Sequence, residues 1–385
     1  DGWKEAFESA DHEAVADRLR RRKLELSMQR FMDPDRFEAA MSSLVPHVVA
    51  WLRRARPEAR FDPLRVDERP DESGELVDVS WELLELGGRA ACEALVGLLS
   101  EATLRAKSAE TLAELASDVR DEGAFDGGFL DDADALRSPG VVTAMRAAPR
   151  RRAALAALVP GLVEAIRAHP DVRVRLVGVL GDAGVGGERA SAVVEELGRS
   201  PSADERTAAY AAAATVLDPE RAPAFLEERL RAEPDDDART AAADGLWRCG
   251  APGFRHVRAT FASLKPAARI AVLKALREGL PGLVLGPTAR GDTREAVEED
   301  PDAEREHDRS RADRPTGAAI ARLPRLELVA FVRSVWVEAP GPRVRGLSLA
   351  CLTALRGLGL DDLDRVLADL GVPSESLRAA AVDAI

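Results

Sequence analysis

The sequence predicts an all-α protein in which antiparallel helix pairs stack into a solenoid. Arg173, Arg206, Arg239 and Arg269 recur at intervals of 33, 33 and 30 residues. Apolar residues follow each of these arginines at three, four and seven positions, which is the spacing of one face of a helix. The chain has only 4% aromatic residues, which is unusual for a protein with a large sheet core. One helical pattern repeated at a near-constant interval is typical of stacked helices.

The clearest copy of the repeated pattern is ARTAAADGLWRCG at 238–250. Here Arg239 is followed by Ala242, Ala243 and Leu246, and Gly250 ends the segment. An apolar first helix is expected before each arginine-anchored second helix. These first helices are expected over 157–168, 189–200, 221–232 and 254–264.

These residues resemble the second helix of HEAT-type repeats, whose pattern is Val-Arg-x-x-Ala-Ala-x-Ala-Leu-Gly. The resemblance covers 81–280 and 318–385. The interval is shorter than the ~40–47 residues of long HEAT repeats, so the unit resembles the short, bacterial-style HEAT-like repeat. The resemblance implies a right-handed α-solenoid whose second helices line the concave face. The signatures of tetratricopeptide and ankyrin repeats do not occur.

Changes in composition divide the chain into four segments. Residues 1–80 are expected to form an N-terminal helical cap region that ends in a polar loop, and 81–285 to form HEAT-like repeats. Residues 286–317 are strongly charged and nearly lack apolar bulk, so they cannot offset the entropy of ordering and are expected to be a disordered insert. Further HEAT-like repeats are expected over 318–385, and the chain ends inside one of them.

The charge and the cysteines restrict the partners and the compartment. The formal net charge is −13, which disfavours contact with nucleic-acid phosphates. A run of about 18 apolar residues is missing, so we expect no membrane span. Cys92, Cys249 and Cys351 lie far apart in apolar helical patterns, which indicates core residues rather than disulfides or a zinc site. We therefore expect an acidic protein of the cytoplasm.

Acidic residues stand just before the anchoring arginines. Carboxylates at a helix start accept hydrogen bonds from free N–H groups and face the positive end of the helix dipole. Stacking would also bring each aspartate close to the arginine of a neighbouring repeat. The sequence thus predicts a structural Asp–Arg ladder formed by Asp171, Arg173, Asp204, Arg206, Asp237 and Arg239.

The second helices also carry the candidate binding residues. Tryptophan and arginine are the usual anchors of protein interfaces. We expect another protein or a peptide to bind at the exposed positions Asp244, Trp247, Arg248, Lys274 and Arg277. For Trp247 the alternative is packing against the next repeat.

The sequence contains no pattern that predicts catalysis. The five histidines are scattered and form no His-x-x-x-His or nucleophile–histidine pattern. Asp131, Asp132 and Asp134 resemble a calcium loop, but Leu136 and Val142 stand where its glycine and glutamate are needed. We therefore expect no catalytic residue, no cofactor and no metal. A non-catalytic interaction scaffold is the leading hypothesis, and a bilin-lyase-like or DNA-glycosylase-like protein, both of which occur among short HEAT-like proteins, is the alternative.

Overall fold

A computed structural model describes residues 2–8, 11–55, 72–124, 152–280, 315–339 and 341–384. Over these ranges the secondary structure is helical and contains no strand. The chain divides into two compact units, 1–196 and 197–385. Asp131, Asp132, Asp134 and nearly all of the expected insert lie outside the described residues.

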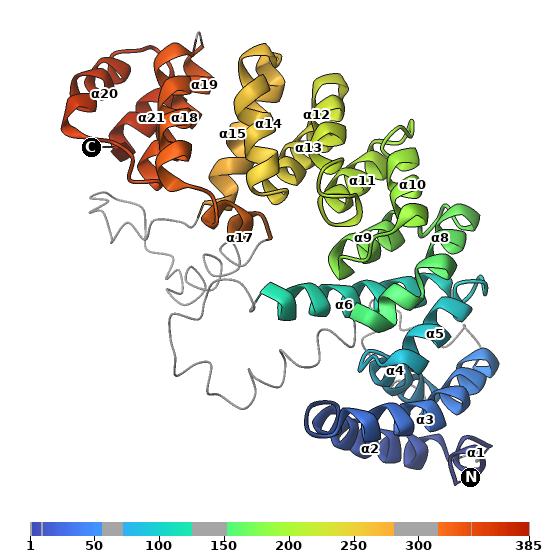
Figure 1. Cartoon of the computed structure of the whole chain (residues 1–385). Helices are drawn as coiled ribbons and strands as arrows, with labels where there is room; N and C mark the ends of the chain where they lie inside the picture. The colour runs from blue at the N-terminus through green and yellow to red at the C-terminus, as the bar shows by residue number, and fades with distance from the viewer. Residues whose placement is uncertain are drawn as a thin grey trace. The chain divides into compact units, whose positions relative to one another are not determined.

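The helices of the first unit fall into two rows. Helix α1 contacts α3, α3 contacts α5 and α5 contacts α8, whereas α2 contacts α4 and α6 contacts α9 (Figure 1). The first set forms the row of first helices and the second set the row of second helices. The bounds are α1 (Gly2–Glu8), α2 (His12–Met32), α3 (Pro34–Arg54), α4 (Glu72–Leu84), α5 (Arg89–Leu98), α6 (Arg105–Ala124), α8 (Val159–Ala168), α9 (Arg173–Ala183) and α10 (Glu188–Leu197).

The N-terminal helices continue the repeat pattern. Helix α4 runs through residue 80, where the sequence placed the end of the N-terminal region, and packs against α2. The repeat was not visible here in the sequence, since these helices lack the arginine-anchored stripe. Helices α4 and α5 are separated at Gly87 and Gly88, which have φ angles of 79° and 85°. Glycine adopts these angles without steric cost.

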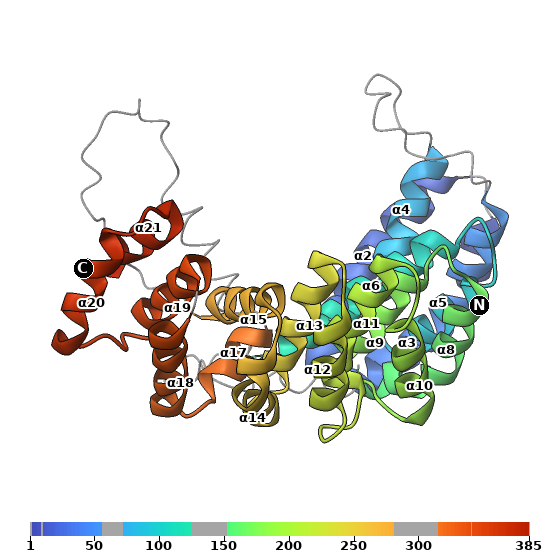
Figure 2. The same ribbon diagram turned by 90° about the horizontal axis from the view of Figure 1, so that it is seen from above.

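The second unit has one continuous row of second helices. In this row α11, α13, α15, α19 and α21 contact one another in turn (Figure 2). Because α15 contacts α19 directly, the repeats on either side of 281–314 stack on each other. The bounds are α11 (Ala203–Val216), α12 (Ala222–Ala232), α13 (Asp236–Arg248), α14 (Ala251–Thr260), η2 (Phe261–Ser263), α15 (Pro266–Gly279), α17 (Pro315–Ala321), α18 (Arg325–Glu338), α19 (Pro342–Ala354), η3 (Leu360–Asp362), α20 (Leu363–Leu370) and α21 (Glu375–Ala384).

The predicted helical stripes form the core. Ala242, Ala243 and Leu246 are at most 1% exposed, and the equivalent residues of α9 are fully buried. Helix starts follow the sequence as well. The Asp33 side chain accepts a hydrogen bond from the Arg36 N–H, and Pro34 takes the first helical position, where its missing N–H costs nothing. The all-α solenoid of stacked helix pairs is therefore confirmed.

Replacing Leu246 by Ala should lower the free energy of unfolding by about 2–5 kcal/mol, because the change leaves a cavity between packed helices. Urea unfolding followed by circular dichroism would measure the loss. As a control, Leu326→Ala removes a side chain that is 86% exposed and should change stability by less than about 0.5 kcal/mol. Equal effects of the two substitutions would contradict the assigned core.

Candidate functional site

The anchoring arginines close the turn between the two helices of a repeat. The last carbonyl groups of a helix have no partner within that helix. In five repeats an arginine at or near the start of the second helix donates hydrogen bonds to backbone carbonyls. The acceptors lie at the end of the first helix or in the turn between the two helices. The contacts are Arg105 Nε to Leu99 O at 2.8 Å, Arg173 Nε to Ile166 O at 2.9 Å, Arg206 Nη1 to Ser200 O at 2.9 Å, Arg239 Nη2 to Pro234 O at 2.8 Å and Arg269 Nε to Leu264 O at 2.9 Å.

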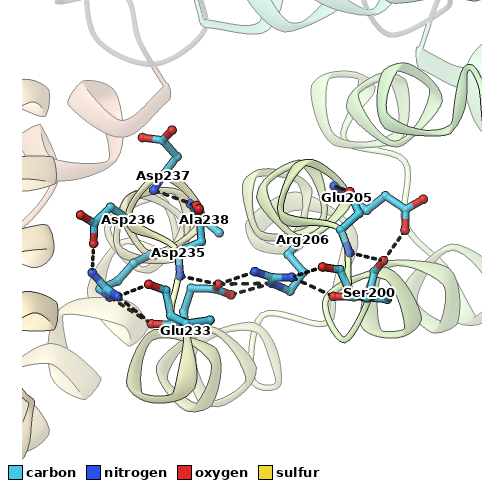
Figure 3. A network of polar contacts seen from close by, with 12 residues as sticks. Ser200, Glu205, Arg206, Glu233, Asp235, Asp236, Asp237 and Ala238 are labelled. Carbon is cyan, nitrogen blue, oxygen red and sulfur yellow. Dashed lines mark hydrogen bonds and ion pairs between the residues drawn. The ribbon is translucent and has the colours of Figure 1, made fainter.

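Arg206 also joins its own repeat to the next one (Figure 3). Its Nε and Nη2 donate to Glu233, with the shortest contact 2.7 Å from Nη2 to Oε1. The Glu233 side chain, which is only 1% exposed, lies in the turn between α12 and α13. Glu233 also accepts from the Tyr210 hydroxyl at 2.8 Å and from the Asp235 N–H at 3.1 Å. A buried carboxylate with this many donors has its charge compensated.

Two further ion pairs link consecutive repeats in the same way. Arg105 Nη1 lies 3.2 Å from Asp171 Oδ2, and Arg345 pairs with the buried Asp369. Asp369 also accepts from the indole N–H of Trp336 at 2.8 Å. In each pair the arginine comes from one repeat and the acid from the repeat that follows.

Ion pairs between an arginine and an acid of the next repeat do occur, as the predicted ladder requires. Some of the paired residues differ from those predicted. Asp171 does pair with the arginine of the preceding repeat. The partner of Arg206 is Glu233, rather than Asp204 or Asp237. Arg239 pairs with Asp236 of its own helix. The prediction overlooked that a side chain in the turn before a helix can be closer to the neighbouring repeat than one in the first helical turn.

The environment of Glu233 sets its ionisation. Burial by itself would raise the pKa of Glu233, but the hydrogen bonds from Arg206, Tyr210 and the Asp235 backbone outweigh it and hold the pKa below its usual value. Burial, together with the bond to Glu233, raises the pKa of Tyr210, which stays protonated at neutral pH. The network is thus an anion held by fixed donors.

The lowered pKa of Glu233 predicts a pH-dependent stability. The unfolded carboxyl takes a proton near pH 4.5, while the folded one stays charged, so Glu233 stabilises the protein above this pH. This contribution is lost as the pH falls through the folded pKa. The difference in unfolding free energy between the wild type and Glu233→Gln should be constant above about pH 5.5 and should shrink below about pH 4.5. Urea titrations from pH 7 downwards measure it.

The exposed Glu220 provides the control. Glu220→Gln should change the unfolding free energy at neutral pH by less than about 0.5 kcal/mol. A wild-type to Glu233→Gln difference that stays constant down to pH 3 would contradict the charged state assigned to Glu233.

Trp247 does not lie on the surface, so its predicted role in partner binding is wrong. Its side chain is fully buried, and Nε1 donates to the carbonyl oxygen of Val272 at 2.9 Å. Its ring stacks on Phe254 with the centroids 6.1 Å apart. The alternative, packing against the next repeat, is the correct one.

The other predicted binding residues separate into two pairs. Lys274 and Arg277 are exposed on α15, one helical turn apart. Asp244 and Arg248 are half-buried on α13. Arg248 Nη1 donates to the Ala211 carbonyl of α11 at 2.7 Å, so this guanidinium also holds two repeats together.

The contact made by Asp244 was missed in the sequence. Its Oδ1 accepts from the Thr316 hydroxyl at 2.6 Å, and Thr316 belongs to α17. Helix α17 packs on α13 and α15, with Thr316 and Ile320 only 4% and 3% exposed. It begins at Pro315, inside the range expected to be an insert. Its few small residues gave no helical stripe that could have revealed it.

The remaining chemical groups have structural roles. His256 Nδ1 lies 2.9 Å from Glu227 Oε2, which connects α14 to α12. Burial raises the pKa of both Cys249 and Cys351 to about 12, so neither is a ready nucleophile at neutral pH.

Among the described residues no group of three or more potential metal ligands gathers. In the same residues, every helix is too short or too polar to cross a membrane.

The chain shows distant similarity to known helical structures. No protein-family model matches the chain, and no curated protein matches it. Among solved structures, the crystal structure of Kap121p bound to Nup53p aligns with 96% of this chain at 13% identity and a TM-score of 0.39. The aligned part is 40% of that chain, so the present chain spans less than half of its length. The helical-repeat architecture rests on the helix contacts described above.

Proposed function

We propose that this protein is a non-catalytic scaffold that binds another protein or a peptide on the exposed side of its second helices, the side that faces away from the first helices. The surface consists of Asp244 and Arg248 on α13 and of Lys274 and Arg277 on α15. The observation that carries the proposal is the packing of α17 on these same two helices. A short helical segment already rests on this surface, which is the kind of contact that a partner segment would make.

The construction of the surface supports this role. Arg239 and Arg269 bond carbonyl groups in the turns before α13 and α15, and Arg248 bonds the Ala211 carbonyl of α11, so both helices are held in place before a partner arrives. A rigid base lowers the entropy lost on binding. Lys274, whose Nζ lies 4.0 Å from Glu278 Oε1, and Arg277 add two exposed cations on α15. They favour a partner segment with carboxylates at this point, and neutralising rim charges of this kind changes association.

The chemistry of the chain favours a scaffold over the enzyme alternatives. A DNA glycosylase stacks bases on aromatic side chains in a basic channel. Here Trp247 and Trp336 are buried in the repeat stack, and the net charge is −13. Both arguments also disfavour nucleic acid as the partner.

A capture experiment with the full chain as bait tests the proposal. The double variant Lys274→Glu/Arg277→Glu reverses the exposed charges, and Arg255→Glu/Lys265→Glu reverses two exposed charges elsewhere in the same unit. A partner protein should be captured by the wild type and by the control, and captured about tenfold less by the Lys274/Arg277 variant. Equal capture by all three baits, or recovery of nucleic acid instead of protein, would refute the proposal. Circular dichroism checks that each bait is folded.

A further inference from the structure

Helix α17 is attached to a stack that is complete without it. Helices α13, α15 and α19 contact one another in sequence, and α17 lies on α13 and α15 from outside this row. A helix of seven residues is not stable by itself in water. The conformation of α17 therefore depends on the few contacts that it makes with the two longer helices.

Among the described side chains of α17, Thr316 and Ile320 are buried and make such contacts. The Thr316 hydroxyl donates to the Asp244 carboxylate at 2.6 Å. Ile320, one helical turn later, packs with Thr316 over Gly279 near the end of α15. A Cβ atom at position 279 would lie 2.7 Å from Ile320 Cδ1 and 3.0 Å from Thr316 Cγ2, so a larger residue there would displace the Ile320 side chain from this contact. Asp244 and Gly279 together define the α17-binding surface.

We propose that the α17-binding surface is a docking site for a short helical segment of a partner protein, and that α17 competes with the partner for it. The recognised segment carries a hydroxyl residue followed four positions later by an aliphatic residue, with small residues between them. The hydroxyl bonds Asp244, the aliphatic side chain covers Gly279, and the small residues allow the two helices to approach. This inference rests on the proposed scaffold function and adds the chemistry of the partner and its regulation.

The competition follows from the position of α17. Because α17 is part of the same chain, it stays close to the surface even when it is detached. A partner binds only to the fraction of molecules in which α17 is detached. The apparent affinity is reduced by that fraction. Weakening the α17 contacts should therefore strengthen the binding of an external segment.

Fluorescence anisotropy with a labelled peptide of residues 315–323 tests the inference on the full chain. The variant Thr316→Val/Ile320→Ala should bind this peptide roughly tenfold more tightly than the wild type does. Adding Asp244→Ala to that variant should remove the gain, and a peptide with the same two substitutions should not bind. As a matched control, Arg322→Ala changes an exposed residue next to α17 and should bind the peptide as weakly as the wild type.

Several results would overturn the inference. The first is equal affinity of the wild type and of Thr316→Val/Ile320→Ala for the peptide. The second is tighter peptide binding by that double variant that persists after Asp244→Ala is added. A dimer formed on mixing the variant with wild-type chain, detected by light scattering, would assign the surface to a second copy instead. If the variant does not fold, hydrogen exchange on the wild-type chain decides. Excess peptide should speed exchange of the α17 amides, and unchanged exchange refutes the competition.

The outcome is separable from that of the scaffold proposal. Loss of the captured partner in Lys274→Glu/Arg277→Glu, together with no peptide gain in Thr316→Val/Ile320→Ala, would leave the scaffold standing and reject the competition. Peptide binding that depends on Asp244 without any captured partner would reject the charged surface around Lys274 and Arg277.

Discussion

The stack depends on a guanidinium group held against backbone carbonyls. An arginine near the start of the second helix bonds the carbonyl oxygens at the end of the first helix or in the turn after it, in five repeats from Arg105 to Arg269. Those oxygens would otherwise be left without an intrahelical partner. Arginine suits the position because its planar group presents several donors at once, which a lysine ammonium at the same place could not arrange in one plane. The contact fixes the angle between the paired helices.

The same guanidinium groups connect neighbouring repeats. Arg105 and Arg206 each use their remaining donors on an acid of the following repeat, Asp171 and Glu233. The two contacts differ in exposure, because the Asp171 side chain is 54% exposed and that of Glu233 only 1%. An exposed pair contributes little to stability, whereas removing one partner of a buried pair leaves an uncompensated charge. Removing Glu233 should therefore destabilise the protein more than removing Asp171.

Much of the fold could be predicted because the apolar residues three, four and seven positions after each arginine mark the buried face of a helix. The residues after Arg239 are buried where the period places them. The partners of the arginines could not be predicted in the same way. Every residue has a backbone carbonyl, so the sequence does not show which carbonyl an arginine will contact. Trp247 shows a related limit. Its position in the helix was correct, yet only the neighbouring carbonyl of Val272 and the ring of Phe254 show that it points into the stack. All four residues of the proposed surface could be suggested from the sequence, whereas the packing of α17 on α13 and α15 could not.

The direct contact between α15 and α19 has an evolutionary consequence. Two helices that are neighbours in space can be joined by a chain of almost any length, because the entropic cost of closing a loop grows only with the logarithm of its length. The contact between α15 and α19 therefore sets no fixed length for the chain that joins Leu280 to Pro315. New sequence could be tried at this junction without a new fold.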